Sequence, residues 1–183
     1  MRVETGVRAL LWLANVALTL TWLVAWAMGR VAASFSAELS PLRLHIAMGS
    51  LATLLSLFAS TCILFYFIGT GLWMRDQAKE IVVLDRKAGL EVWRLYEEAN
   101  RLKAGPFAFA TFGLALGLFG YILGGATHVG AIPPWVHPTL ATLLVANNWI
   151  AQRFTFRNMV KNVAYLDEAS DRLDAAEAAA RPG

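Results

Sequence analysis

Residues 44–74 read LHIAMGSLATLLSLFASTCILFYFIGTGLWM, an apolar run without a single charged side chain, and Arg75 closes it. About 20 such residues in a helix cross the hydrocarbon core of a bilayer, so this run predicts a membrane-spanning helix. Three more runs with uncharged interiors occupy residues 9–28, 106–125 and 136–155. The sequence therefore predicts an all-α integral membrane protein whose four spans form a helical bundle.

The composition of the chain agrees with this class. Of its 183 residues, 57% are hydrophobic and only 16% are charged, whereas soluble domains average about a quarter charged residues. The single cysteine, Cys62, excludes an internal disulfide and a CxxC site. The first apolar run is longer than the core of a signal peptide and contains Trp12, Trp22 and Trp26, so we expect it to be retained as an anchor.

The positive charges predict the orientation of the spans. Fourteen of the 16 Lys and Arg residues lie before the first span, between the second and third, or from Arg153, at the end of the fourth, onward. Basic loops stay in the cytoplasm, so both termini are expected there, in a bacterial cytoplasmic (inner) membrane. Six acidic residues balance the seven basic ones in the central loop, and this excludes a nucleic-acid-binding surface. The lipid bilayer is the predicted surrounding.

The cytoplasmic segments are predicted to extend the bundle. Residues 75–104 have a helical pattern, but one straight helix would end about 45 Å from the membrane, given a rise of about 1.5 Å per residue. We therefore expect a helical hairpin that turns at Gly89, after Lys87. A C-terminal helix is predicted over residues 156–178, where apolar side chains recur every three or four positions.

Small and polar side chains indicate which faces of the spans point inward. The third span carries four glycines on one face, which favour close helix packing: Gly113, Gly117, Gly120 and Gly124. Polar residues avoid lipid, so the following side chains are also expected inside the bundle: Tyr66, Asn147, Asn148 and Gln152.

Three histidines are the main candidate ligands. His45 opens the second span and His137 opens the fourth, so both lie at the same depth near the outer face. Two imidazoles from different helices are the minimal axial set for haem b. With His128 from the outer loop, the three side chains could instead bind copper or zinc. The alternative is structural, with each histidine bonding to the backbone at a helix end.

The run Phe65-Tyr66-Phe67-Ile68-Gly69-Thr70-Gly71 resembles a segment of a family of small bacterial four-span membrane proteins with no assigned function. A histidine opening the second span, and a histidine and an asparagine in the fourth, extend the resemblance. It implies the four-span fold and no activity.

Two main hypotheses for the function follow. The first is a structural or accessory subunit that packs against a larger membrane complex or against further copies of itself. The second is an electron-transfer or metal-binding protein that uses His45 and His137. An oligomeric passive channel is a further alternative. Nothing in the sequence indicates an enzyme, because no paired carboxylates, phosphate-binding loop or nucleophile elbow occurs.

Overall fold

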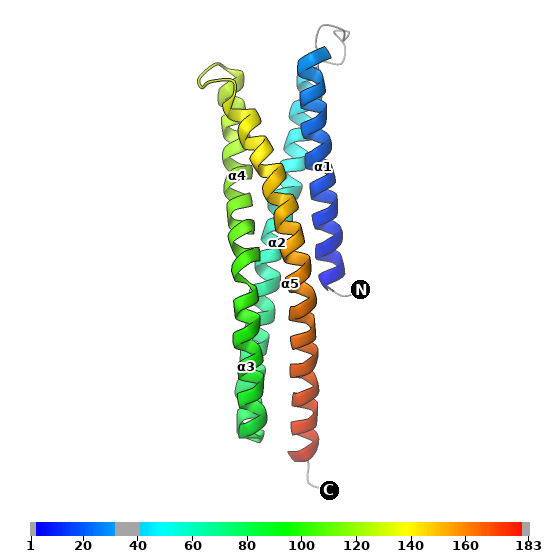
Figure 1. The fold of residues 1–183 in the computed structure, drawn as a ribbon, viewed down its shortest axis with the longest axis vertical. Coiled ribbons are helices and arrows are strands. Elements are labelled where there is room, and N and C mark those ends of the chain that lie inside the picture. The colour runs from blue at the N-terminus through cyan, green and yellow to red at the C-terminus, as the bar shows by residue number, and fades with distance from the viewer. Residues whose placement is uncertain (1–2, 32–40, 181–183) are drawn as a thin grey trace. The chain divides into compact units, whose positions relative to one another are not determined.

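The computed structural model describes residues 3–31 and 41–180, which form five helices and no strand (Figure 1). The helices are α1 (Val3–Val31), α2 (Pro41–Leu84), α3 (Arg86–Leu102), α4 (Ala104–His128) and α5 (Val136–Ala180). The fold is all-α, as the sequence predicts. The expected loop between the first two spans falls mainly on residues 32–40, which lie outside the described residues.

Three segments of the described chain are long and apolar enough to cross a membrane. They are Thr5–Ala27, Arg43–Leu84 and Arg86–His128. The expected fourth span, residues 136–155, lies in α5 but is not one of the three. Its polar side chains, among them Asn147, Asn148 and Gln152, lower its hydropathy.

The segments predicted to extend beyond the membrane begin inside long continuous helices. α2 has 44 residues and α5 has 45, so the predicted C-terminal helix is the second half of α5 rather than a separate element. A helix needs only about 20 residues to cross a bilayer. Both helices therefore have more than enough length to continue beyond it.

The turn after α2 lies at Asp85 rather than at Gly89. The Asp85 carboxylate accepts hydrogen bonds from the backbone N–H groups of Lys87, at 2.8 Å, and Ala88, at 3.2 Å, and so caps the start of α3. Gly89 has a different role within α3. A Cβ there would lie 2.5 Å from both the N and Cα atoms of Val82, so glycine permits the close approach of α3 to α2.

The chain forms two compact units. The first unit comprises Met1–Cys62 and Ala108–Arg153. Two indole N–H groups join α1 to α5 within it: Trp22 donates to Thr142 Oγ1 and Trp149 donates to Thr19 Oγ1, both at 3.0 Å. One buried apolar residue from each of its four helices forms its core cluster: Leu18, Ala52, Leu116 and Leu144.

The second unit comprises Ile63–Phe107 and Phe154–Gly183. Its core contains buried apolar residues from α2, α3 and α5: Met74, Ala78, Ile81, Val92, Ala99, Ala169 and Ala176. The pKa of the Tyr165 phenol is raised above its usual value, mainly by a hydrogen bond to Glu98. The phenol is therefore neutral at physiological pH. Arg172 on α5 pairs with Glu168 on the same helix and with Glu91 on α3. The pair with Glu91 links α5 to α3.

Candidate functional site

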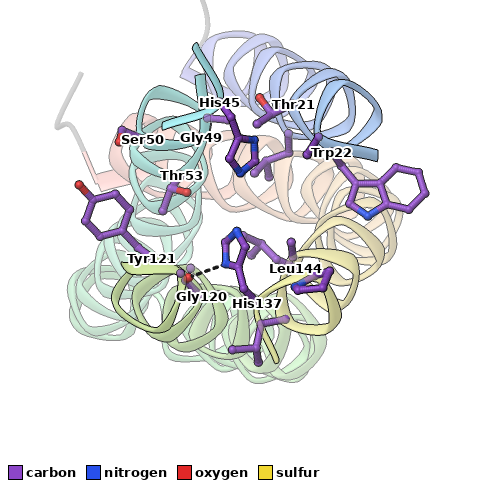
Figure 2. A pocket seen from close by; sticks show the side chains of 18 of the residues that line it. Thr21, Trp22, His45, Gly49, Ser50, Thr53, Gly120, Tyr121, His137 and Leu144 are labelled. Carbon is purple, nitrogen blue, oxygen red and sulfur yellow. Dashed lines mark hydrogen bonds between the residues drawn. The ribbon is translucent and has the colours of Figure 1, made fainter. Parts of the chain in front are cut away.

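His45 and His137 come together in the first unit. α2 contributes His45 and α5 contributes His137, each close to the start of its helix. The centres of the two imidazole rings are 6.1 Å apart and their planes are inclined by 79°. The two side chains point toward one another across the space between the helices (Figure 2). The structure thus brings the two imidazole rings close together.

A hydrogen bond to α4 orients the His137 ring. Its Nδ1 atom lies 3.2 Å from the carbonyl oxygen of Gly120 (Figure 2). A carbonyl oxygen only accepts, so Nδ1 carries the proton and Nε2 keeps its lone pair. Histidines that bind metals commonly donate their other N–H group to a backbone carbonyl in this way. His45 Nδ1 is buried and has no protein partner, so that imidazole also retains an uncommitted nitrogen.

Both rings line a cavity of about 660 Å³. This volume falls within the usual range for small-molecule and cofactor sites. All four helices of the first unit contribute to its walls, which are mainly apolar and contain several small residues, such as Gly49 and Ala141. Thr21 and Thr53 also line it, while the Tyr121 side chain points away from the two histidines (Figure 2). The arrangement is a mainly apolar, partly open pocket with two imidazoles facing one another.

The glycine face of α4 packs against other helices of the first unit. A Cβ atom at any of these four glycines would lie close to a side chain of α2 or α5. A Cβ at Gly124 would lie 2.8 Å from Cε1 and Nδ1 of His137. At Gly120 it would lie 3.9 Å from Leu140 Cβ, and at Gly117 3.1 Å from Leu57 Cδ2. At Gly113 the nearest atom would be Asn147 Nδ2, at 2.9 Å. Gly124 therefore provides the space that the His137 ring occupies.

The polar residues of the fourth predicted span lie inside the first unit, where they bond to α1, α2 and α4. Asn15 donates to Gln152 Oε1, and Asn148 donates to Ser56 Oγ at 2.6 Å. Asn147 donates to the Phe109 carbonyl at 3.1 Å. All five of these side chains are buried. They form a layer of amide and hydroxyl groups.

Tyr66 lies in the second unit and takes part in a separate polar cluster. Asn162 Nδ2 donates to the Tyr66 hydroxyl at 3.3 Å and to Thr70 Oγ1 at 3.1 Å. The sequence reasoning did not single out Asn162. The only feature of the sequence that indicates the burial of Asn162 is its position on the helical face that also carries Met159 and Ala169. Both of these residues are buried with it.

His128 borders the same cavity as the other two histidines. However, the described part of the chain contains no group of three or more His, Cys, Asp or Glu side chains that could hold a metal ion. The predicted three-histidine set for copper or zinc is thus not assembled, and the structure brings together His45 and His137 alone as facing ligands.

Comparison of the chain with models of protein families, with curated proteins and with solved structures gives no match.

Proposed function

We propose that this chain is a bacterial inner-membrane protein that binds one haem b between His45 and His137 and transfers electrons. The observation that carries the proposal is the convergence of the two rings, 6.1 Å between centres, inside a cavity. Haem iron supplies a one-electron redox centre when it is bound. The residues of this chain would provide its axial nitrogens and an apolar enclosure.

The geometry of the pair suits two ligands of one iron. Metal–nitrogen bonds of about 2 Å place two opposite nitrogens about 4 Å apart, and ring centres lie farther apart than the nitrogens. The separation of 6.1 Å between the ring centres is compatible with this spacing. His45 and His137 would hold the iron, and the inclination of 79° between their planes does not prevent both rings from presenting a nitrogen to it.

The absorption spectrum of the purified protein tests the proposal. After expression in cells that make haem, the protein in mild detergent is expected to show an intense Soret band and the sharp visible bands of a low-spin iron with two nitrogen ligands. Protein isolated without haem should regain these bands on titration with haemin, at one equivalent per chain. A protein that stays colourless and gains no such bands with haemin would contradict the proposal.

Gly124 provides a matched test of how the His137 ring is positioned. Gly124→Ala is expected to weaken haem binding by about 10- to 100-fold, the range observed when groups that orient a metal ligand are changed. The new methyl group would lie 2.8 Å from the imidazole, whereas a methyl group at Gly125 would contact nothing within 4 Å. Gly125→Ala is therefore the control. Equal haem affinities of the two variants, from haemin titration, would show that Gly124 does not position the ring.

We also propose that residues 136–155 form a fourth span and that both termini are cytoplasmic, which places the histidine pair at the outer face. The distribution of the Lys and Arg residues supports this orientation. It predicts that alkaline phosphatase, which is active only outside the cytoplasm, is active when fused after Gly130 and inactive when fused after Gly89. The reverse pattern of activities would overturn the orientation.

An accessory subunit is a second candidate function, and the end of α2 favours it. Val83 is 85% exposed and Leu90, just beyond the turn, is 60% exposed. Val82 and Leu84 beside them are exposed as well. A contiguous exposed apolar patch outside the membrane marks a contact with another protein. If a partner covers them, Val83→Ser with Leu90→Ser should remove a stoichiometric partner from the complex purified in mild detergent. An unchanged complex would exclude this surface as the contact.

A further inference from the structure

The layer of amide and hydroxyl groups in the first unit contains two hydrogen-bond acceptors that no protein group satisfies. Asn15 Oδ1 and Asn147 Oδ1 are buried and have no hydrogen-bond partner. The two residues are only 1% and 6% exposed. Buried polar atoms without partners are rare in proteins, and each one calls for an explanation such as an internal water molecule or an ion.

The amide nitrogens of the three asparagines in this layer already have protein partners. Asn15 Nδ2 donates to Gln152 Oε1 and to the carbonyl of Asn148. Asn147 Nδ2 donates to the carbonyl of Phe109. The amide nitrogens of Asn15 and Asn147 are thus engaged, while their oxygens have no partner. Whatever completes the layer must therefore donate hydrogen bonds or carry positive charge.

The backbone of α4 leaves room for polar atoms at this depth. A Cβ at Gly113 would lie 2.9 Å from Asn147 Nδ2, 3.3 Å from Asn148 Oδ1 and 3.4 Å from Ser60 Oγ. Polar atoms from α2 and α5 therefore gather at one point beside α4. A larger side chain at Gly113 would displace them.

An apolar layer separates these groups from the histidine cavity. On α1, Leu18 lies three residues after Asn15, on the side of the cavity. On α2, Ala52 lies four residues before Ser56. Leu144 lies four residues before Asn148 on α5. Three or four residues are about one helical turn. The apolar cluster of Leu18, Ala52, Leu116 and Leu144 thus lies one turn from the polar layer on each helix, toward the cavity.

We propose that the polar layer is an internal water site, in which at least one water molecule donates hydrogen bonds to Asn15 Oδ1 and Asn147 Oδ1. Water suits the site better than a cation does, because an ion in the membrane interior normally needs a charged partner. The polar layer contains only neutral amides and hydroxyls. The apolar cluster keeps this water apart from the cavity.

A density map of the wild-type protein in lipid nanodiscs, at a resolution that shows ordered water, tests the site directly. We expect a density peak within hydrogen-bonding distance of each of the two amide oxygens. In a map of Gly113→Ala, the peak at Asn147 should be lost or displaced, whereas Gly120→Ala should leave it in place, because the new methyl group would lie 3.9 Å from Leu140 Cβ. A wild-type map with rotated amides, both satisfied by protein donors and without a peak, would overturn the proposal.

The identity of the occupant is tested by thermal unfolding in sodium, potassium or choline chloride at equal ionic strength. A ligand that binds the folded state raises the unfolding temperature with its concentration. For a water site, we expect the same unfolding temperature in all three salts. A concentration-dependent rise in sodium or potassium alone would show that the layer binds a cation and would refute the water site. Neither measurement depends on whether haem binds to the histidine pair.

Discussion

Purified His45→Ala and His137→Ala are each expected to lose haem binding, with an increase in the dissociation constant of more than about 100-fold. This bound is conservative, because groups that merely orient a metal ligand change affinity by about 10- to 100-fold. Both rings face the same cavity. His128 also borders it, but the described residues contain no group of three such side chains that could hold a metal ion, so we expect no replacement for a lost ring. Titration of each variant with haemin, followed by absorbance, measures the effect.

His128→Ala is the matched control for these two variants. Its side chain is exposed at the edge of the cavity, so we expect its loss to leave the haem spectrum and affinity unchanged. If His128→Ala abolished binding as well, the ligand set would differ from the one proposed. Thermal unfolding of all three proteins without haem separates a lost ligand from a misfolded chain. Unaltered haem binding by His45→Ala or His137→Ala would contradict the proposal.

The two histidines could be singled out as a pair from the sequence because each lies close to the start of a long helix. His45 and His137 each begin a long apolar segment, and the polar stripes that follow them favour an inward orientation. The bond from His137 to the Gly120 carbonyl was not predictable. It depends on the rotation of α4 about its axis, and the glycine face alone allows several rotations.

The turn after α2 shows how two valid local rules can compete. Lys87 and Gly89 have the arrangement typical of a helix C-terminus, but Asp85 is also a preferred residue at a helix N-terminus. The aspartate determines the turn because its carboxylate satisfies two backbone N–H groups of α3. Gly89 is required instead for the contact with Val82, which no local pattern reveals.

The polar residues of the fourth apolar run were predicted to point inward, but their partners were not. Asn148 meets Ser56 and Asn15 meets Gln152, residues that are 92 and 137 positions apart in the chain. Such pairings depend on helix order and register, which the spacing of residues within one helix does not determine. The same side chains lower the hydropathy of the run, so the polar layer also explains why the apolar signal of this segment is weak.

Replacing Gly89 with alanine is expected to have the largest effect on the stability of the helical extension, a loss of about 3 kcal/mol or more. Overpacking of a close contact costs about 1–3 kcal/mol and sometimes more, and here the obstacle is the backbone of Val82, only 2.5 Å from the new carbon atom.

Gly71→Ala is the matched control in the same unit. Its new carbon atom would lie 2.5 Å from Lys103 Nζ, but this is the end of a flexible side chain that can move away, so we expect little change. Circular dichroism during thermal unfolding in detergent, supported by protease sensitivity of residues 75–104, measures both variants. Equal unfolding temperatures and equal protection would show that α2 and α3 do not approach as closely as this contact requires.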